Sequence, residues 1–580
     1  KIHCKLGTAQ SRLDIFAVLS QQLTNKSLTN KLKPSETPKD LNMTAEKTMI
    51  FSSGDRLDSE AKVCDAGVES AFSVPKRSFN HSNNKKIKEL DLEDKHHFQL
   101  TRDTVNENVL KAEYAVRGPV LERALEIEQK LKEDPNSYPF DKVVQCNIGN
   151  PQALSQKPIT FTRQVLSLVM NPDMLGDESI AHAFPRDARE RAKSYLDCIK
   201  SVGAYSESSG MDVVRREVAT FIRSRDSVPV DEHDIFLTAG ASDGVERMMR
   251  ILLRSDKDAV LVPVPQYPLY SALTTAFNGH FAPYYISEEA GWELDMVGVR
   301  ESLKRARQLG KNVRAMVVIN PGNPTGSVLS NNSMEEIVKF CIEEKIVLMA
   351  DEVYQQNVYT ADKEFVSFRK IARDLGVISS AGKLLEPLQL VSFHSSSKGV
   401  VGECGLRSGY LDLLGFSKEV KKEVYKLASI KLCSNVPGQI AMGLMVNPPC
   451  VGDESYSKFK AEVDDIFNSL KRRSKKLQNT LNTLDGIHCN DIEGAMYAFP
   501  KIELPERFIN KARQQGDSPE TLYAIETLEQ TGLVIVPGSG FGQAEGTYHF
   551  RTTFLPPDDE FDEVLQRFSQ FHSRFMHENS

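Results

Sequence analysis

The sequence predicts an α/β fold with a large domain and a smaller one. Five short apolar runs between residues 234 and 393 alternate with helical segments, which is the pattern of a mostly parallel sheet covered by helices on both faces. After about residue 455, a long polar helix and three short strands predict a smaller α+β domain built from both ends of the ordered chain. The polar first hundred residues predict a disordered N-terminal extension.

These patterns divide the chain into four parts. Residues 1–103 form the disordered extension, 104–155 an N-terminal arm and part of the small domain, 156–455 the large domain, and 456–580 the C-terminal small domain. Up to Glu36 the extension has one acidic residue, Asp14, against six basic ones, and several apolar residues fall on one helical face. An organelle transit peptide has this pattern, and an arbitrary disordered tail explains it equally well, so we expect a mitochondrial or cytoplasmic protein.

Composition excludes several classes of function. The chain of 580 residues is 40% hydrophobic and 26% charged with a net charge of −7, and it lacks the basic character that nucleic-acid binding requires. No run of about 18 apolar residues is present, so we expect no transmembrane helix. The nine cysteines are scattered singly, which argues against a disulfide scaffold and a zinc site. We therefore expect neither nucleic acid, nor membrane, nor metal as a partner.

The expected elements follow in order along the chain. A helix is predicted over residues 120–132, after Pro119, and a short strand over residues 143–152 ends in Gly149–Asn150–Pro151. In the large domain, strands are predicted at residues 234–238, 259–264, 315–320, 347–351 and 388–393, with helices at 243–253 and 334–344. In the smaller domain, a helix is predicted at residues 458–481 and strands at 495–499, 534–537 and 548–554.

Polar side chains follow nearly every predicted strand of the large domain. In parallel α/β sheets, ligands bind beyond the carboxyl ends of the strands. Ala241 and Ser242 open a helix whose N–H groups suit a phosphate. Asp351 follows a buried apolar run and needs a cationic or donor partner. Ser395, Ser397 and Lys398 follow the last strand, and lysine is the side chain that forms Schiff bases.

Each of these residues has a simpler explanation when taken alone. Tyr267 suits ordinary packing, Asn323 suits the tight turn PGNPTG, and Lys398 suits a solvated loop. One cofactor explains all five strand ends together. Pyridoxal 5′-phosphate needs a lysine for its aldehyde, an acid for its pyridine nitrogen, donors for its ring oxygen, a ring to stack on, and a phosphate cup. The sequence therefore predicts a pyridoxal-phosphate site, with Arg407 completing the cup.

From about residue 104 to its end, the chain resembles the aspartate-aminotransferase-type, fold-type I pyridoxal-phosphate enzymes. The motifs that carry the resemblance are NPGNPTG at residues 320–326, ADEVY at 350–354, and Ser395–Lys398 with Arg407. Within this superfamily the chain resembles the alanine aminotransferases most, in the longer stretches at residues 110–118, 138–151, 204–210 and 393–405.

The resemblance implies a role for each site residue. Lys398 would form the Schiff base with the cofactor, Asp351 would keep the pyridine nitrogen protonated, and Arg551 would bind the substrate α-carboxylate. Gly149 would lie against the same carboxylate. The other contacts would come from Asn323 and Tyr354 at the ring oxygen, from Tyr267 stacked on the ring, from Ala241, Ser242, Ser395, Ser397 and Arg407 at the phosphate, and from Tyr205 of the second subunit of a homodimer.

The implied reaction is transfer of the amino group of alanine to 2-oxoglutarate, which gives pyruvate and glutamate by a ping-pong mechanism. Amino acids and 2-oxo acids would be the small-molecule partners. The alternatives are a glutamate:glyoxylate aminotransferase, a pyridoxal-phosphate lyase on the same fold, and a non-catalytic ligand sensor. One departure from the family pattern is Ser408, which stands where the family usually has glycine after the phosphate arginine.

Overall fold

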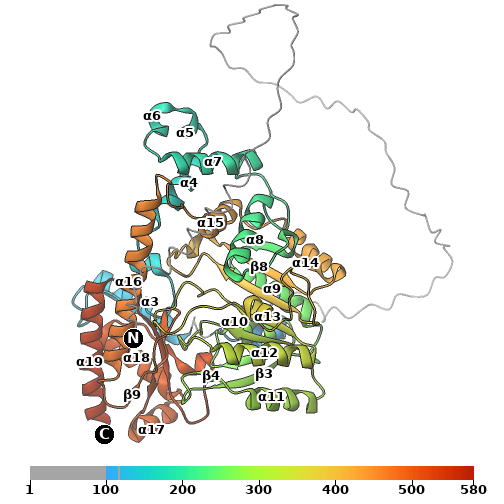
Figure 1. Ribbon diagram of the computed structural model, residues 1–580. Coiled ribbons are helices and arrows are strands. Elements are labelled where there is room, and N and C mark those ends of the chain that lie inside the picture. Colours follow the sequence, from blue (N-terminus) through green and yellow to red (C-terminus); the bar gives the residue numbers. More distant parts are fainter. Residues whose placement is uncertain (1–99, 115–117) are drawn as a thin grey trace, which may run out of the picture. The chain divides into compact units, whose positions relative to one another are not determined.

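A computed structural model describes residues 100–114 and 118–580 (Figure 1). The predicted transit segment, and the predicted extension up to residue 99, lie outside the described residues. Residues Arg102–Ser580 form one compact unit. No helix among the described residues is long and apolar enough to cross a membrane. The same residues contain no group of three His, Cys, Asp or Glu side chains that could hold a metal ion.

The described part of the chain contains an eight-stranded sheet in the order β1-β8-β7-β6-β5-β2-β3-β4. The pairs β2·β3, β2·β5, β5·β6 and β6·β7 are parallel, whereas β8 is antiparallel to both β1 and β7, and β4 is antiparallel to β3. The strands are β1 (Ile235–Thr238), β2 (Asp258–Val264), β3 (His280–Ser287), β4 (Glu293–Leu294), β5 (Asn312–Ile319), β6 (Val347–Asp351), β7 (Leu390–Ser395) and β8 (Gly409–Leu414). The prediction of a mostly parallel sheet is confirmed, and the chain adds β3, β4 and β8, which were not predicted.

Helices cover both faces of this sheet, as predicted. Because successive side chains of a strand point to opposite faces, Ala259 and Leu261 of β2 pack in one core, and Val260 and Val262 pack in another. The first core also holds residues of α11 (Met296–Gln308), α12 (Asn331–Glu344) and α13 (Phe368–Asp374). The second also holds residues of α9 (Ala241–Leu252), α10 (Leu269–Ala276) and α14 (Lys418–Ile430).

A further core lies beside the sheet, where Val165, Tyr195, Val218 and Ile440 pack together. It is formed by α4 (Thr160–Met170), α7 (Arg186–Cys198), α8 (Asp212–Asp226) and α15 (Val436–Val446). The remaining short helices of the described chain before the C-terminal region are α2 (Glu107–Lys111), α5 (Asp173–Gly176) and α6 (Glu178–Ala181), with 3-10 turns at Pro151–Leu154, Glu232–Asp234 and Cys404–Leu406.

The smaller domain joins the two ends of the described chain, as predicted. Val120 and Ile127 of α3 (Pro119–Glu133) share one core with Leu477, Tyr523 and Phe568. A three-stranded antiparallel sheet, β10-β13-β12, lies in this domain. Its elements are α16 (Tyr456–Leu481), β9 (Ile487–His488), β10 (Tyr497–Ala498), β11 (Lys501–Ile502), α17 (Glu506–Gln515), α18 (Pro519–Thr531), β12 (Val536–Pro537), a 3-10 turn (Gly538–Phe541), β13 (Phe550–Thr553) and α19 (Asp558–Asn579).

The strand predicted over residues 143–152 does not form. Only Val144 makes a β-bridge, to Leu533, and a 3-10 turn begins at Pro151. Two of the backbone carbonyls between these points bond to side chains instead, because Asn147 accepts from Arg551 and Gly149 accepts from Lys398. The apolar run predicted a strand, whereas its backbone is used to line the region described next.

Candidate active site

The carboxyl ends of the parallel strands bring the predicted residues to one edge of the sheet. Lys398 follows β7, Asp351 ends β6, and Asn323 follows β5. Because β7, β6 and β5 are parallel neighbours, these three side chains come from adjacent strand ends. Tyr267 follows β2, which is the next strand along.

Lys398 is partly buried and its amine is held at a fixed point. Nζ donates a hydrogen bond to the Gly149 carbonyl oxygen at 2.7 Å and lies 6.0 Å from the centroid of the Tyr354 ring. A larger residue at position 149 would displace side chains of the site, because a methyl group there would lie 2.9 Å from Lys398 Nζ and 2.3 Å from Tyr497 Oη. The absence of a side chain at residue 149 therefore leaves room for the amine beside its carbonyl.

Asp351 is a buried carboxyl of which one oxygen accepts a hydrogen bond. Its Oδ2 accepts a hydrogen bond from Tyr270 Oη at 2.7 Å, and Oδ1 has no hydrogen-bond partner among the described residues. Burial raises the pKa of Asp351 to about 6, although the Tyr270 hydroxyl, the Val353 N–H and the Lys398 charge act in the opposite direction. A cationic or N–H group placed at Oδ1 would satisfy this oxygen.

Two tyrosines form the middle of the site. The rings of Tyr354 and Tyr497 meet edge to face with centroids 6.0 Å apart, and the Tyr354 hydroxyl donates to Tyr497 Oη at 3.3 Å. Asn323 Nδ2 donates to Tyr354 Oη at 3.5 Å. Both rings are buried, and the two hydroxyl groups and the Asn323 amide form a buried chain of hydrogen bonds.

Arg551 of β13 carries its guanidinium into the same region and is only 1% exposed. Its Nη1 donates to Asn323 Oδ1 at 3.0 Å, and its Nη2 donates to the Asn147 carbonyl. The guanidinium carbon lies over the rings of Tyr497 and Phe541, 4.2 and 4.5 Å from their centroids. The two rings hold the guanidinium plane, as binding a planar carboxylate requires.

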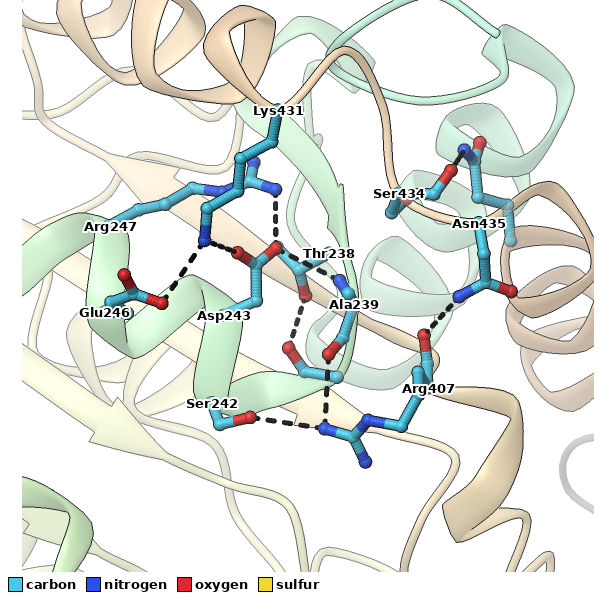
Figure 2. Close-up of polar contacts among 12 residues, drawn as sticks. Thr238, Ala239, Ser242, Asp243, Glu246, Arg247, Arg407, Lys431, Ser434 and Asn435 are labelled. Atoms are coloured by element: carbon cyan, nitrogen blue, oxygen red, sulfur yellow. Dashed lines mark hydrogen bonds and ion pairs between the residues drawn. The ribbon is translucent and has the colours of Figure 1, made fainter. Parts of the chain in front are cut away.

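The Arg407 side chain closes the end of the site near β1. Its Nη2 donates to Ser242 Oγ and to the Ala239 carbonyl, both at 3.2 Å, and Figure 2 shows these contacts at the start of α9. A side chain at Gly240 would lie 2.4 Å from Arg407 Nη2, and Gly240 has a φ of 85°, so glycine is required there. The N-terminus of α9, with Ala241 and Ser242, therefore lies against a guanidinium, which is a suitable arrangement for an anion.

The hydroxyl of Ser395 stabilises the turn that carries Lys398. The Ser395 hydroxyl donates to the Ser408 carbonyl at 3.0 Å and accepts from the Ser397 N–H at 3.0 Å, so it holds the turn itself together. The resemblance implies a phosphate contact for both serines, and both contacts stay predictions. In the structure the turn is built by the hydroxyl of Ser395.

Tyr267 and Tyr205 lie in different surroundings. Tyr267 Oη shares a hydrogen bond with Tyr114 Oη at 2.8 Å, and burial raises its pKa well above the ordinary range. Tyr205 is 77% exposed, and the hydrogen bonds described for the phosphate end do not include it. The structure therefore brings the other predicted residues to one edge and leaves Tyr205 on the surface.

Sequence reasoning missed two residues of the site, Tyr270 and Tyr497. Tyr270 lies on α10 and reaches Asp351 across the intervening strand β5. Tyr497 lies on β10 of the smaller domain, 143 residues after its hydrogen-bond partner Tyr354. A tyrosine in a helix or a short strand carries no local signal of such a contact, because the contact depends on how elements distant in the sequence pack together.

Comparison with known proteins places the chain among the aminotransferases. Residues 173–568 match the family described as aminotransferase class I and II. The chain is 50% identical over 478 residues to alanine aminotransferase 2 of Panicum miliaceum, covering 82% of this chain and 98% of that protein. It is 48% identical over 482 residues to a mitochondrial alanine aminotransferase 2 of Arabidopsis thaliana, covering 83% and 88%.

Two further proteins extend the comparison. The chain is 48% identical to glutamate–glyoxylate aminotransferase 1 of Arabidopsis thaliana, covering 82% of this chain and 96% of that protein. A solved alanine aminotransferase of Pyrococcus furiosus superposes with a TM-score of 0.62 at 25% identity, covering 81% and 99%. The chain belongs to the aminotransferase class I and II family, whose enzymes depend on pyridoxal phosphate and act on amino and 2-oxo acids.

Proposed function

We propose that the chain is a pyridoxal-phosphate-dependent aminotransferase that transfers the amino group of alanine to 2-oxoglutarate, giving pyruvate and glutamate. One observation carries the proposal. The Lys398 amine and the Arg551 guanidinium lie against the paired rings of Tyr354 and Tyr497, and the buried carboxyl of Asp351 lies close enough to Lys398 for their charges to interact. A reactive amine, a carboxylate-binding cation and a buried acid are what an amino-acid site on this cofactor needs.

The residues present fit the cofactor. Asp351 Oδ1 is buried without a partner among the described residues, so it offers an acceptor for the pyridine N–H, and a cation there would offset the cost of burying the carboxylate. Asn323 and Tyr354 are buried donors for the ring oxygen. The cofactor would further be held by Lys398 at its aldehyde, by Tyr267 against its ring, and by Ala241, Ser242, Ser395, Ser397 and Arg407 around its phosphate.

The residues of the chain perform the remaining chemistry. When bound, pyridoxal phosphate supplies an aldehyde for the amino group and a ring that accepts the electron pair of the substrate α-carbon. Lys398 removes the α-proton as general base and returns a proton as general acid. Arg551 binds the α-carboxylate and so fixes which substrate bond faces Lys398. A second, oxo-acid substrate then receives the amino group by the reverse steps, which makes the scheme ping-pong.

The choice of alanine rests on the relatives named alanine aminotransferase, which match 82 to 83% of this chain at 48 to 50% identity. Glutamate with glyoxylate is the second candidate, supported by 48% identity to an enzyme named for those substrates. The two candidates share the site described above and differ in which amino acid reacts.

A half-reaction screen tests the proposal. The protein loaded with pyridoxal phosphate is mixed separately with alanine, glutamate, glycine and aspartate, and the absorbance of the lysine-bound cofactor is followed. We expect alanine and glutamate to convert the cofactor to its amine form. A protein that binds the cofactor but does not respond to alanine would defeat the alanine assignment. Lys398→Ala is the control, because it should remove both the absorbance and the response.

A homodimer is part of the proposal because of Tyr205. Its ring is 77% exposed, although the resemblance gives it a contact with the cofactor phosphate. Both statements hold if Tyr205 serves the site of a second copy. Sedimentation of the loaded enzyme should give a dimer. Tyr205→Phe should weaken cofactor binding without dissociating the dimer.

We also propose the division into residues 104–155, 156–455 and 456–580 as arm, large domain and small domain. The shared core of α3 with α18 and α19 supports it. The location is proposed to be mitochondrial or cytoplasmic, since some relatives are named as mitochondrial proteins.

A further inference from the structure

Tyr497 is a residue of the site to which neither the sequence nor the proposed function gives a role. It lies on β10 and is 2% exposed. The Tyr354 hydroxyl donates to its oxygen at 3.3 Å, and the Arg551 guanidinium lies 4.2 Å from its ring centroid. The side chain is therefore buried with contacts on both its ring face and its oxygen.

The oxygen of Tyr497 lies beside the Lys398 amine. Both atoms approach Gly149 from the same side, since a methyl group built there would lie 2.3 Å from Tyr497 Oη and 2.9 Å from Lys398 Nζ. The Gly149 carbonyl accepts from the same amine at 2.7 Å. The amine therefore donates to a backbone oxygen of Gly149, and the Tyr497 oxygen lies against the same glycine, close enough for Lys398 to act on its pKa.

The electrostatics of Tyr497 agree with this arrangement. Burial acts to raise the pKa of its hydroxyl. The charges of Lys398 and Arg551, with hydrogen bonding from Tyr354 and Lys398, outweigh burial and bring the pKa below its ordinary value. Other buried tyrosines, such as Tyr270 and Tyr523, have a raised pKa. The Tyr497 oxygen therefore faces two cations and accepts from the Tyr354 hydroxyl, so its surroundings suit an acceptor for the Lys398 amine.

We propose that Tyr497 is a positioning residue for Lys398, which it holds together with the Gly149 carbonyl. This inference rests on the proposed function, in which Lys398 exchanges the α-proton. A neutral lysine amine has two N–H groups and one lone pair. Two oxygen acceptors fix the two N–H groups, and the lone pair is left to face the substrate. When the amine takes the α-proton, the same two oxygens stabilise the ammonium without moving.

Tyr497→Phe tests the proposal, because phenylalanine keeps the ring beneath Arg551 and removes only the oxygen. We expect kcat for alanine to fall about tenfold, the usual loss for one hydrogen bond, with KM nearly unchanged. The α-deuterium isotope effect on kcat should rise, because proton transfer becomes slower than the other steps. Cofactor content, the absorbance of the lysine-bound cofactor and the unfolding temperature should match the wild type.

The matched control is Tyr523→Phe, which removes another buried hydroxyl, bonded to His572 Nδ1 at 2.9 Å in the smaller domain. It should leave kcat and the isotope effect unchanged. The proposal is overturned if Tyr497→Phe keeps kcat and the isotope effect of the wild type, or if it loses cofactor or raises KM instead. Failure of the proposed function differs from this, because it appears in the wild-type protein, which would not convert alanine.

Discussion

Replacing Asp351 with asparagine is expected to stabilise the cofactor-free protein at neutral pH and to abolish its chemistry. Burial raises the pKa of Asp351 from an ordinary value of 3.8 to about 6. Below about pH 4 the carboxyl is protonated in both the folded and the unfolded chain. Between about pH 4 and pH 6 only the folded chain holds the proton, so its stability falls as pH rises.

The size of the effect follows from the shift. One pKa unit corresponds to about 1.36 kcal/mol, so a shift from 3.8 to about 6 costs about 3 kcal/mol of folding free energy above pH 6. Asparagine has nearly the same shape, carries no charge, and keeps an oxygen that can accept from Tyr270. Asp351→Asn should therefore match the wild type near pH 4 and exceed it by about 3 kcal/mol above pH 6, which is about 3 °C in the unfolding temperature of a chain this long.

The assay is thermal unfolding of both proteins, free of cofactor, from about pH 4 to pH 8. The difference between the two proteins isolates position 351, because every other titrating group is shared. When both proteins are loaded with pyridoxal phosphate, the wild type should become the more stable of the two, since its carboxylate then pairs with the pyridine N–H. A variant that is no more stable at pH 8 than at pH 4, relative to the wild type, would refute the reasoning.

Three more substitutions test separate parts of the site. Arg551→Lys loses the planar pair of donors that reach Asn323 and Asn147, so KM for alanine should rise at least about tenfold in steady-state kinetics. Gly149→Ala places a methyl group 2.3 Å from Tyr497 Oη, so kcat/KM should fall about ten- to hundredfold while the protein still folds. Ser408→Gly removes a buried hydroxyl that has no hydrogen-bond partner among the described residues and keeps the carbonyl that Ser395 uses, so the cofactor Kd from absorbance titration should change less than about threefold.

For each of these three substitutions, one result would contradict the role given to the residue. An unchanged KM in Arg551→Lys would mean that the α-carboxylate binds elsewhere. Full activity in Gly149→Ala would mean that the close approach of Tyr497 and Lys398 does not matter in the working enzyme. A Kd more than about tenfold higher in Ser408→Gly would show that this hydroxyl holds the cofactor, contrary to its lack of a partner.

The strand ends of the large domain were predictable because each ends an apolar run with an abrupt polar group. Asp351 and Lys398 are conspicuous for this reason, and the order of parallel strands then brings them together. Strand β8 was missed because Asp412 interrupts its apolar run. In the structure Asp412 is buried and paired with Arg369 at 2.6 Å, so a charge in a central strand is tolerated.

Contacts between distant segments were not predictable from the sequence. Tyr270 follows β2 and reaches Asp351 at the end of β6, although β5 lies between these two strands. Tyr497 comes close to Lys398 because the smaller domain packs on the larger one. The run at residues 143–152 has the composition of a strand, but two of its carbonyls accept hydrogen bonds from Arg551 and Lys398. The local sequence pattern predicts which helices and strands form. The contacts of these residues depend on how those helices and strands pack together.

The most direct test of the account is to locate the covalently bound cofactor. Borohydride reduces the bond between a lysine and pyridoxal phosphate to a stable amine, and peptide mass spectrometry then identifies the labelled residue. The account predicts a pyridoxyl group on Lys398 alone, and it predicts that alanine added before the reductant removes the label, because the substrate amino group displaces Lys398. A label on another lysine, or a label on Lys398 that alanine leaves unchanged, would contradict the account.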